Sequence, residues 1–151
     1  MIERSIKLLL EKSKKSTLLL GPRQTGKSTL MGSLLPDLKI NLASEATYLE
    51  FARNPRELEE RVGGGRFKTV FIDEVQRLPG LFNTLQVLID ESSPSIKFYL
   101  TGSSARKLRR GKANLLPGRI HTYHLGPLVS AELNYQMDEK CLFLLFPSLP
   151  A

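Results

Sequence analysis

Nine residues near the N-terminus have the types and the spacing needed to bind a polyphosphate. They run from Gly21 to Thr29, read GPRQTGKST, and fit G-x-x-x-x-G-K-[ST] at every fixed position of that pattern. The two glycines of such a loop let the backbone wrap closely around phosphate groups, where a side chain would collide with the ligand. The backbone N–H groups of the loop and the start of a following helix then face the negative charge.

The side chains of this loop have separate expected roles. Lys27 supplies a mobile cation for the β- and γ-phosphates of a nucleotide, and the Ser28 hydroxyl is a ligand for Mg²⁺. The alternative is a chance glycine-rich turn, but the apolar strand pattern before the loop and the apolar helical stripe after it argue against that. We expect the nucleotide to contact the whole loop, namely Gly21, Pro22, Arg23, Gln24, Thr25, Gly26, Lys27, Ser28 and Thr29.

A pair of carboxylates follows the apolar run that begins at Val70. Asp73 and Glu74 would lie at the carboxyl end of a strand buried on both faces, where open α/β sheets bind their ligands. We expect Asp73 to hold Mg²⁺ through a water molecule, because Mg²⁺ keeps several waters in such sites. Glu74 would orient or deprotonate the water that attacks the γ-phosphate. The alternative for this pair is a strand that ends in a solvated acidic turn.

The polar stretch Leu100–Ala105 follows a later expected strand and is the third candidate part of the site. A hydroxyl here would lie between the Asp-Glu strand and the phosphate loop, within reach of the γ-phosphate or the attacking water. Ser103 is the first choice for this catalytic contact and Thr101 is the second. A plain turn, with a serine that caps the next helix, is an equally good interpretation.

Strand and helix patterns alternate along the chain. The expected strands are 16–20, 38–42, 69–72, 96–100 and 119–125. The expected helices are 2–13, 27–35, 44–52 and 80–91, with another that begins at Asn54. Strands that alternate with helices at this pitch predict an α/β fold, with a parallel sheet and helices on both faces.

The composition is typical of a single globular domain in a reducing compartment. The 151 residues are 41% hydrophobic and 25% charged, and their one cysteine, Cys141, excludes an internal disulfide framework. We expect a cytoplasmic protein with no membrane segment, because the longest apolar run, Leu142–Phe146, is far shorter than the ~20 residues that cross a bilayer. The net charge of +7 favours anionic partners, and a nucleotide already meets that expectation.

Together these motifs resemble the AAA+ superfamily of P-loop ATPases. The stretches that carry the resemblance are GPRQTGKSTL (21–30), VFIDEVQRLPGL (70–81), LTGSSARKLRRG (100–111) and LLPGRIHTYHLGPL (115–128). More narrowly, the chain resembles prokaryotic AAA+ ATP-binding proteins of uncharacterised role, in which a separate C-terminal domain follows the ATPase module. The resemblance implies ATP hydrolysis with Mg²⁺, a three-layer P-loop fold with strand order 5-1-4-3-2, and a tendency to oligomerise.

Basic residues suggest two further partners. In such ATPases an arginine at a subunit edge can reach the γ-phosphate of a neighbour. Arg119 is a candidate for this role in a homo-oligomer, as are Arg106, Arg109 and Arg110, although a solvated basic turn is the better interpretation for any one of them. The same cluster would suit nucleic acid phosphates, but no interleaved aromatic residues or nucleic-acid module supports that partner.

The C-terminal part of the chain departs from the pattern. An AAA+ module normally continues into a helical lid, and only about 25 residues follow the fifth expected strand. We expect residues 1–135 to form the ATPase core and residues 136–151, an apolar tail, to begin a missing lid or C-terminal domain. This departure affects the expectation of turnover more than that of binding.

Three functions compete at this point. The leading one is hydrolysis of ATP, with Glu74, Lys27 and Ser103 as catalytic residues and Ser28 and Asp73 as the metal ligands. The second is a nucleotide-binding switch or DNA-associated module that binds ATP with little turnover. The third is a small-molecule kinase, which the Asp-Glu pair disfavours because a kinase must exclude water rather than activate it.

Overall fold

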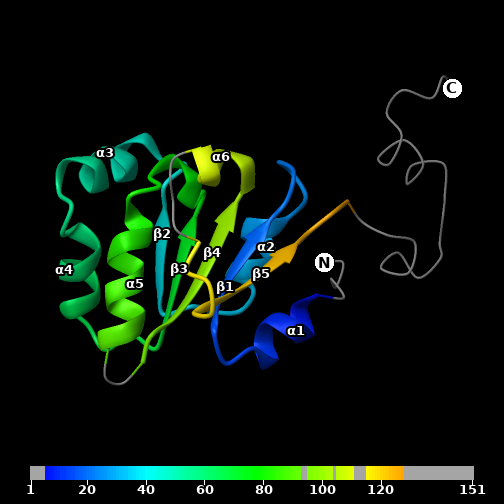
Figure 1. Ribbon diagram of the computed structural model, residues 1–151, viewed down its shortest axis with the longest axis horizontal. Helices are drawn as coiled ribbons and strands as arrows, with labels where there is room; N and C mark the ends of the chain where they lie inside the picture. Colours follow the sequence, from blue (N-terminus) through cyan, green and yellow to red (C-terminus); the bar gives the residue numbers. More distant parts are fainter. Residues whose placement is uncertain (1–5, 93–94, 104, 111–114, 128–151) are drawn as a thin grey trace, which may run out of the picture.

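Five parallel strands form one sheet that lies between two layers of helices (Figure 1). The computed structural model describes residues 6–92, 95–103, 105–110 and 115–127. Its strands are β1 (Ser16–Leu20), β2 (Leu38–Asn41), β3 (Thr69–Asp73), β4 (Lys97–Gly102) and β5 (Ile120–His124). Its helices are α1 (Lys7–Lys12), α2 (Lys27–Gly32), α3 (Glu45–Arg53), α4 (Glu57–Gly63), α5 (Leu81–Glu91) and α6 (Ala105–Arg110), with a short 3-10 helix, η1, at Val75–Arg77.

The strands are ordered β2-β3-β4-β1-β5, and every neighbouring pair is parallel. Read from the other edge, this is the predicted order 5-1-4-3-2, so the predicted three-layer α/β fold is confirmed. All five residues of β1 are buried, as expected for an inner strand with helices over both faces. The register places Leu20 beside Gly102 and Ile72 beside Leu100, so β1, β3 and β4 end at the same edge of the sheet.

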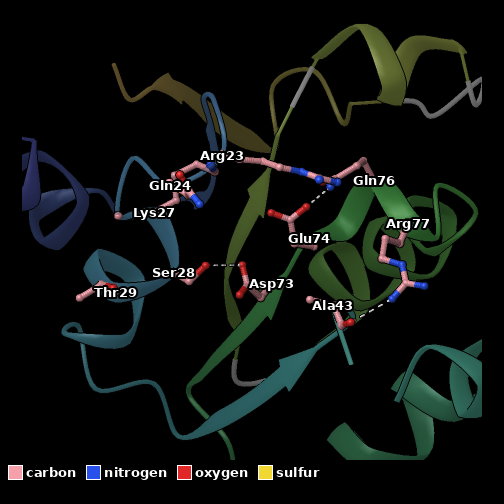
Figure 2. A pocket seen from close by; sticks show the side chains of 11 residues that line it. Arg23, Gln24, Lys27, Ser28, Thr29, Ala43, Asp73, Glu74, Gln76 and Arg77 are labelled. Atoms are coloured by element: carbon pink, nitrogen blue, oxygen red, sulfur yellow. Dashed lines mark hydrogen bonds between the residues drawn. The ribbon is translucent and has the colours of Figure 1, made fainter. Parts of the chain in front are cut away.

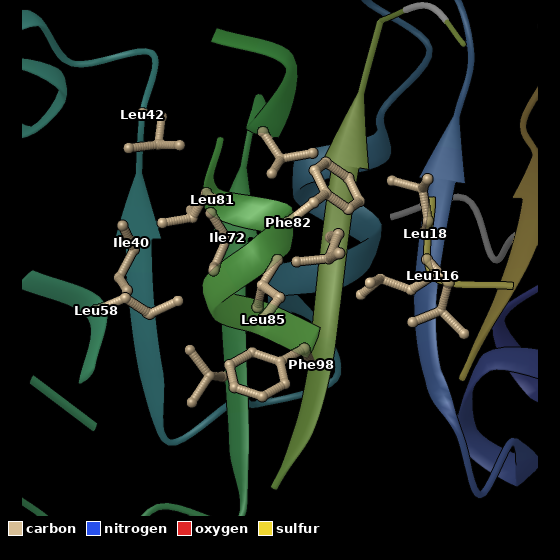
Figure 3. Close-up of a cluster of buried hydrophobic side chains, with 14 of the residues drawn as sticks. Leu18, Ile40, Leu42, Leu58, Ile72, Leu81, Phe82, Leu85, Phe98 and Leu116 are labelled. Carbon is tan, nitrogen blue, oxygen red and sulfur yellow. The ribbon is translucent and has the colours of Figure 1, made fainter. Parts of the chain in front are cut away.

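Each face of the sheet is buried under its own group of helices. On one face, the fully buried Phe82 of α5 shares a cluster with Ile72 and Phe98 of the sheet (Figure 3). Residues of α3, α4 and α6 extend this cluster. On the other face, Leu10 of α1 and Met31 of α2 are fully buried in a second cluster. The prediction of helices on both faces is therefore confirmed.

Each predicted strand is present, with small differences at its ends. The difference that matters for function is in β4, which continues through Thr101 and Gly102 beyond the predicted end at Leu100. The strand extends this far because Gly102 still pairs with Leu20 of β1. Thr101 is therefore part of the sheet rather than of the polar turn that follows it.

Helix α2 ends at Gly32 rather than at the predicted Leu35. A proline disfavours helical backbone at the residue before it, and Pro36 follows Leu35. Leu35 is non-helical, with a positive φ of 51°, and its side chain is exposed. The helix therefore stops one turn short of its apolar pattern.

The helix predicted to begin at Asn54 begins at Glu57. The Asn54 side chain braces the turn that leads into it. Its Oδ1 accepts the Arg56 N–H at 3.0 Å, and its Nδ2 donates to Glu57 at 3.1 Å and to Glu60 at 3.0 Å. Asn54 thus stabilises the start of α4 from two residues earlier than a capping residue would.

Three predicted parts of the chain lie outside the described residues. They are the start of the first helix at residues 2–5, the end of the core at residues 128–135 and the apolar tail at residues 136–151. Among the described residues, no helix combines the length and the hydropathy that a bilayer span requires.

Replacing Phe82 by alanine should lower the free energy of unfolding by about 3–5 kcal/mol, because the loss of a fully buried ring leaves a cavity between α5 and the sheet. Urea-induced unfolding followed by circular dichroism measures this change. Val87 lies on the same helix and is 44% exposed, so Val87→Ala should change the same free energy by less than about 0.5 kcal/mol. Equal losses in the two variants would contradict this description of the core.

Candidate functional site

The loop that follows β1 requires glycine at two positions, for two different reasons. At Gly21, a Cβ atom would lie 2.1 Å from the Leu125 carbonyl oxygen. The Leu125 N–H donates to the Leu20 carbonyl at 2.7 Å, so this approach is fixed by a backbone hydrogen bond. Gly26, which directly precedes α2, has a φ of 82°, a conformation that residues with a side chain rarely adopt. Close packing thus fixes the first glycine, and backbone conformation fixes the second.

Lys27 is a buried cation held by this loop. The residue is 4% exposed, and its Nζ donates to the Pro22 carbonyl at 2.5 Å. The Thr25 hydroxyl donates to the same carbonyl at 2.9 Å, and Gln24 has a positive φ of 62°. The loop is therefore closed on itself around the Pro22 carbonyl, with the ammonium group drawn inside.

Asp73 joins three elements at the carboxyl edge of the sheet. Its Oδ1 accepts a hydrogen bond from the Ser28 hydroxyl at 2.8 Å and another from the Thr101 hydroxyl. Ser28 and Asp73 are 45 residues apart in the sequence, and Figure 2 shows their side chains pointing toward each other. The two predicted metal ligands thus lie side by side. Hydroxyl and carboxylate oxygens are ligands that suit Mg²⁺.

Glu74 has an uncommon backbone conformation. Its φ of 57° and ψ of 44° are left-handed, which costs a residue with a side chain about 1–3 kcal/mol. The Thr101 hydroxyl accepts the Glu74 N–H at 3.0 Å, so the end of β4 stabilises this conformation. The Glu74 carboxylate accepts a hydrogen bond from the side-chain amide of Gln76. The left-handed residue ends β3 and leaves the carboxylate facing the pocket described next (Figure 2).

These groups surround an open pocket with a volume of about 790 Å³. It is lined by Arg23, Gln24, Gly26, Lys27, Ser28, Thr29, Ala43, Asp73, Glu74, Gln76 and Arg77. Most of these residues were predicted from the sequence, and Ala43, Gln76 and Arg77 were not. The pocket therefore combines a phosphate-loop cation, a hydroxyl and two carboxylates, the groups that a metal-nucleotide site needs.

The sequence of residues 13–134 matches the protein family described as an AAA domain. The chain belongs to this family. The resemblance to AAA+ ATPases is thereby confirmed, and membership supports nucleotide binding at the phosphate loop. The AAA domain is also 32% identical over 126 residues to an uncharacterised protein of Mycobacterium bovis and to one of Mycobacterium tuberculosis. These matches cover 82% of this chain and 27% of each relative, so the chain spans about a quarter of the length of those curated proteins.

In this AAA domain, the hydroxyl at the end of β4 that contacts Asp73 belongs to Thr101, the second choice from the sequence. Thr101 is fully buried. Ser103, the first choice, is not among the described residues that line the pocket. Its N–H donates to Oε1 of Gln76 at 3.2 Å, while its buried hydroxyl makes no hydrogen bond within the described part of the chain. A direct catalytic contact of Ser103 stays a prediction.

Arg77 was not predicted, and it fixes the wall of the AAA-domain pocket that faces the phosphate loop (Figure 2). Its guanidinium donates to the carbonyls of Leu42 at 2.7 Å and Ala43 at 3.1 Å. It also pairs with Glu45 at 2.7 Å and lies 4.4 Å from the centre of the Tyr48 ring. These contacts hold the loop between β2 and α3 in place. The only signal in the sequence was the position of Arg77 three residues after Glu74.

Arg119 lies at the amino edge of the sheet, at the opposite end of the strands from the pocket. The next residue, Ile120, pairs with Ser16, where β1 begins. The Arg119 Nε donates to both carboxylate oxygens of Asp90, at 2.7 and 2.9 Å. These hydrogen bonds raise the pKa of the Arg119 guanidinium and lower the pKa of the Asp90 carboxyl. Arg119 therefore does not serve the pocket of its own AAA domain, and its role toward a neighbouring subunit stays a prediction.

Replacing Gly21 by alanine should lower the free energy of unfolding by about 1–3 kcal/mol, because the added methyl group collides with the Leu125 backbone carbonyl. Thermal and urea unfolding of the chain without nucleotide measure this change separately from ligand binding. Gly63, the last residue of α4, has no atom within 4 Å of the added Cβ. Gly63→Ala should therefore stabilise the protein by about 0.4–1 kcal/mol. A Gly21→Ala variant as stable as the unmodified chain would disprove the close approach.

Proposed function

We propose that this chain binds ATP with Mg²⁺ in the pocket and hydrolyses it to ADP and phosphate. The observation that carries the proposal is the contact between Ser28 and Asp73 beside the carboxylate of Glu74. The first two side chains offer oxygen ligands for a hard cation, and the third is a base next to them. The family match supports nucleotide binding at the same loop.

The phosphate loop would supply the positive charge of the site. Lys27 would exchange the Pro22 carbonyl for oxygens of the β- and γ-phosphates, which are stronger acceptors because they are charged. Backbone N–H groups of the loop and the start of α2 would face the remaining phosphate charge. Bound Mg²⁺ neutralises part of the charge on the transferred phosphoryl group, and Ser28 and Asp73 are the residues that would hold it.

The carboxylate of Glu74 would orient the attacking water and accept its proton. It lines the same pocket as Lys27 and Ser28, which supports this role. At the end of β4, Ser103 is proposed as a contact for the γ-phosphate or the water, and Thr101 supports the site through Asp73 and the Glu74 backbone.

Replacing Lys27 by alanine should weaken the binding of Mg²⁺-ATP by about 10-fold to 100-fold, because hydrogen bonds from a cation to the phosphates are lost. Isothermal titration calorimetry measures the dissociation constant directly. Lys39→Ala is the matched control, since Lys39 is an exposed lysine on the edge strand β2. A Lys27→Ala variant that binds ATP as tightly as this control would refute the phosphate site.

Replacing Glu74 by glutamine should keep ATP binding and slow phosphate release by about 100-fold to 10,000-fold, because an amide cannot accept the proton of the water. Single-turnover hydrolysis with excess protein measures the chemical step. If the unmodified chain and the variant both bind ATP and neither releases phosphate, the ATPase proposal is wrong and the alternative, a nucleotide-binding switch with little turnover, holds.

A further inference from the structure

The side chain of Gln76 bridges Glu74 and the end of β4. Its Nε2 donates to the Oε2 atom of Glu74, and its Oε1 accepts the Ser103 N–H at 3.2 Å. Gln76 is partly buried and lines the pocket, yet it is neither a phosphate-loop residue nor part of the Asp-Glu pair. The contacts of Gln76 therefore indicate a function different from that of the phosphate loop and of the Asp-Glu pair.

The orientation of the Gln76 amide is fixed by chemistry. A backbone N–H only donates hydrogen bonds, so the atom that faces Ser103 must be the amide oxygen. The amide NH₂ group must then face Glu74, whose ionised carboxylate only accepts hydrogen bonds. Gln76 is thus suited to both of its neighbours in one orientation alone.

The end of β4 is shaped to receive this amide. A Cβ atom at Gly102 would lie 3.1 Å from Oε1 of Gln76 and 3.0 Å from a side-chain carbon of Leu20. Glycine at this position therefore leaves room for the Gln76 side chain against the strand. Gly102 itself is buried and pairs with Leu20, so the support that the amide rests on is part of the sheet.

Glu74 is consequently held at two points by the carboxyl end of β4 and the residue that follows it. Thr101 accepts its backbone N–H, and the amide of Gln76, anchored at Ser103, binds its carboxylate. Only one carboxylate oxygen, Oε2, is engaged by Gln76. The other oxygen, Oε1, makes no hydrogen bond within the described residues, which suits a group that has to receive a water.

We propose that Gln76 is a positioning residue that fixes the carboxylate of Glu74 for its action on the attacking water. This inference rests on the proposed ATP hydrolysis. A glutamate side chain has three rotatable bonds, and an untethered carboxylate would spend only part of its time aligned with the water. Misplacement of a reacting group by about 1 Å can cost about 100-fold in rate, so the tether acts on turnover and leaves nucleotide affinity to the phosphate loop.

The test compares Gln76→Met with the control Gln86→Met. Methionine has a similar length and no charge, and it cannot bind either Glu74 or Ser103. We expect Gln76→Met to lower kcat by about 10-fold to 100-fold and to change the calorimetric dissociation constant for Mg²⁺-ATP by less than about 2-fold. Gln86 lies on α5 outside the residues that line the pocket, so Gln86→Met should change neither quantity.

A double-mutant cycle isolates the pair. Once Glu74 is glutamine, Gln76→Met should have little further effect on the residual rate, because the two residues act as one unit. A separate readout needs no turnover. In the ¹H–¹⁵N spectrum of the chain without nucleotide, the Gln76 side-chain amide, identified by its loss in Gln76→Met, should shift when Glu74 is replaced by alanine.

The outcomes separate this inference from the proposed function. If Glu74→Gln abolishes hydrolysis while Gln76→Met keeps the full kcat, the positioning role is refuted and the ATPase stands. If Gln76→Met weakens ATP binding by the same factor as it lowers kcat, the role is refuted as well. The same holds if the chemical shift of the Gln76 amide does not change in the Glu74→Ala variant. An unmodified chain that binds ATP without hydrolysing it refutes both.

Discussion

The site depends on one constraint of the sheet: β4 lies between β1, which leads into the phosphate loop, and β3, which carries Asp73. Ser28 and Asp73 therefore meet across the end of a strand that belongs to neither motif. Whatever ends β4 must be small enough to let them meet and polar enough to share their hydrogen bonds. Thr101 meets the second requirement, since its hydroxyl donates to Asp73. Gly102, which has no side chain, leaves room for the Gln76 amide against the end of the strand.

Much of this site could be predicted from sequence because its central motifs are local. The spacing within Gly21–Thr29 and the apolar run before Asp73 are properties of short stretches, and the structure brings both to the same edge of the sheet. The strand order came from the resemblance to AAA+ ATPases and not from the patterns of the strands themselves. The steric reason for glycine at position 21 could not be predicted from a local pattern. Gly21 makes room for Leu125, which lies more than a hundred residues later in the chain.

The features that the sequence did not reveal have a common physical origin, because each depends on contacts between distant parts of the chain. Thr101 was the second choice and stood beyond the expected end of its strand at Leu100, whereas pairing with β1 carries β4 on to Gly102. Gln76 and Arg77 were not predicted because their directions depend on the left-handed backbone of Glu74, which no composition or periodicity reveals. The Asp90 partner of Arg119 is 29 residues away, so its pairing is decided by tertiary structure alone.

The left-handed conformation of Glu74 sets the direction of the short helix η1 that follows it. Glu74 follows β3 with left-handed backbone, and the turn that comes next directs Gln76 toward the end of β4 and Arg77 toward the loop after β2. Strands β4 and β2 lie on opposite sides of β3, so the two side chains tie the turn to both neighbours. A residue anchored on two sides has little freedom to relax into an ordinary conformation, because any rotation of its backbone would break hydrogen bonds on one side or the other. These hydrogen bonds restrain Glu74 beside the pocket, and they offset the cost of its left-handed backbone.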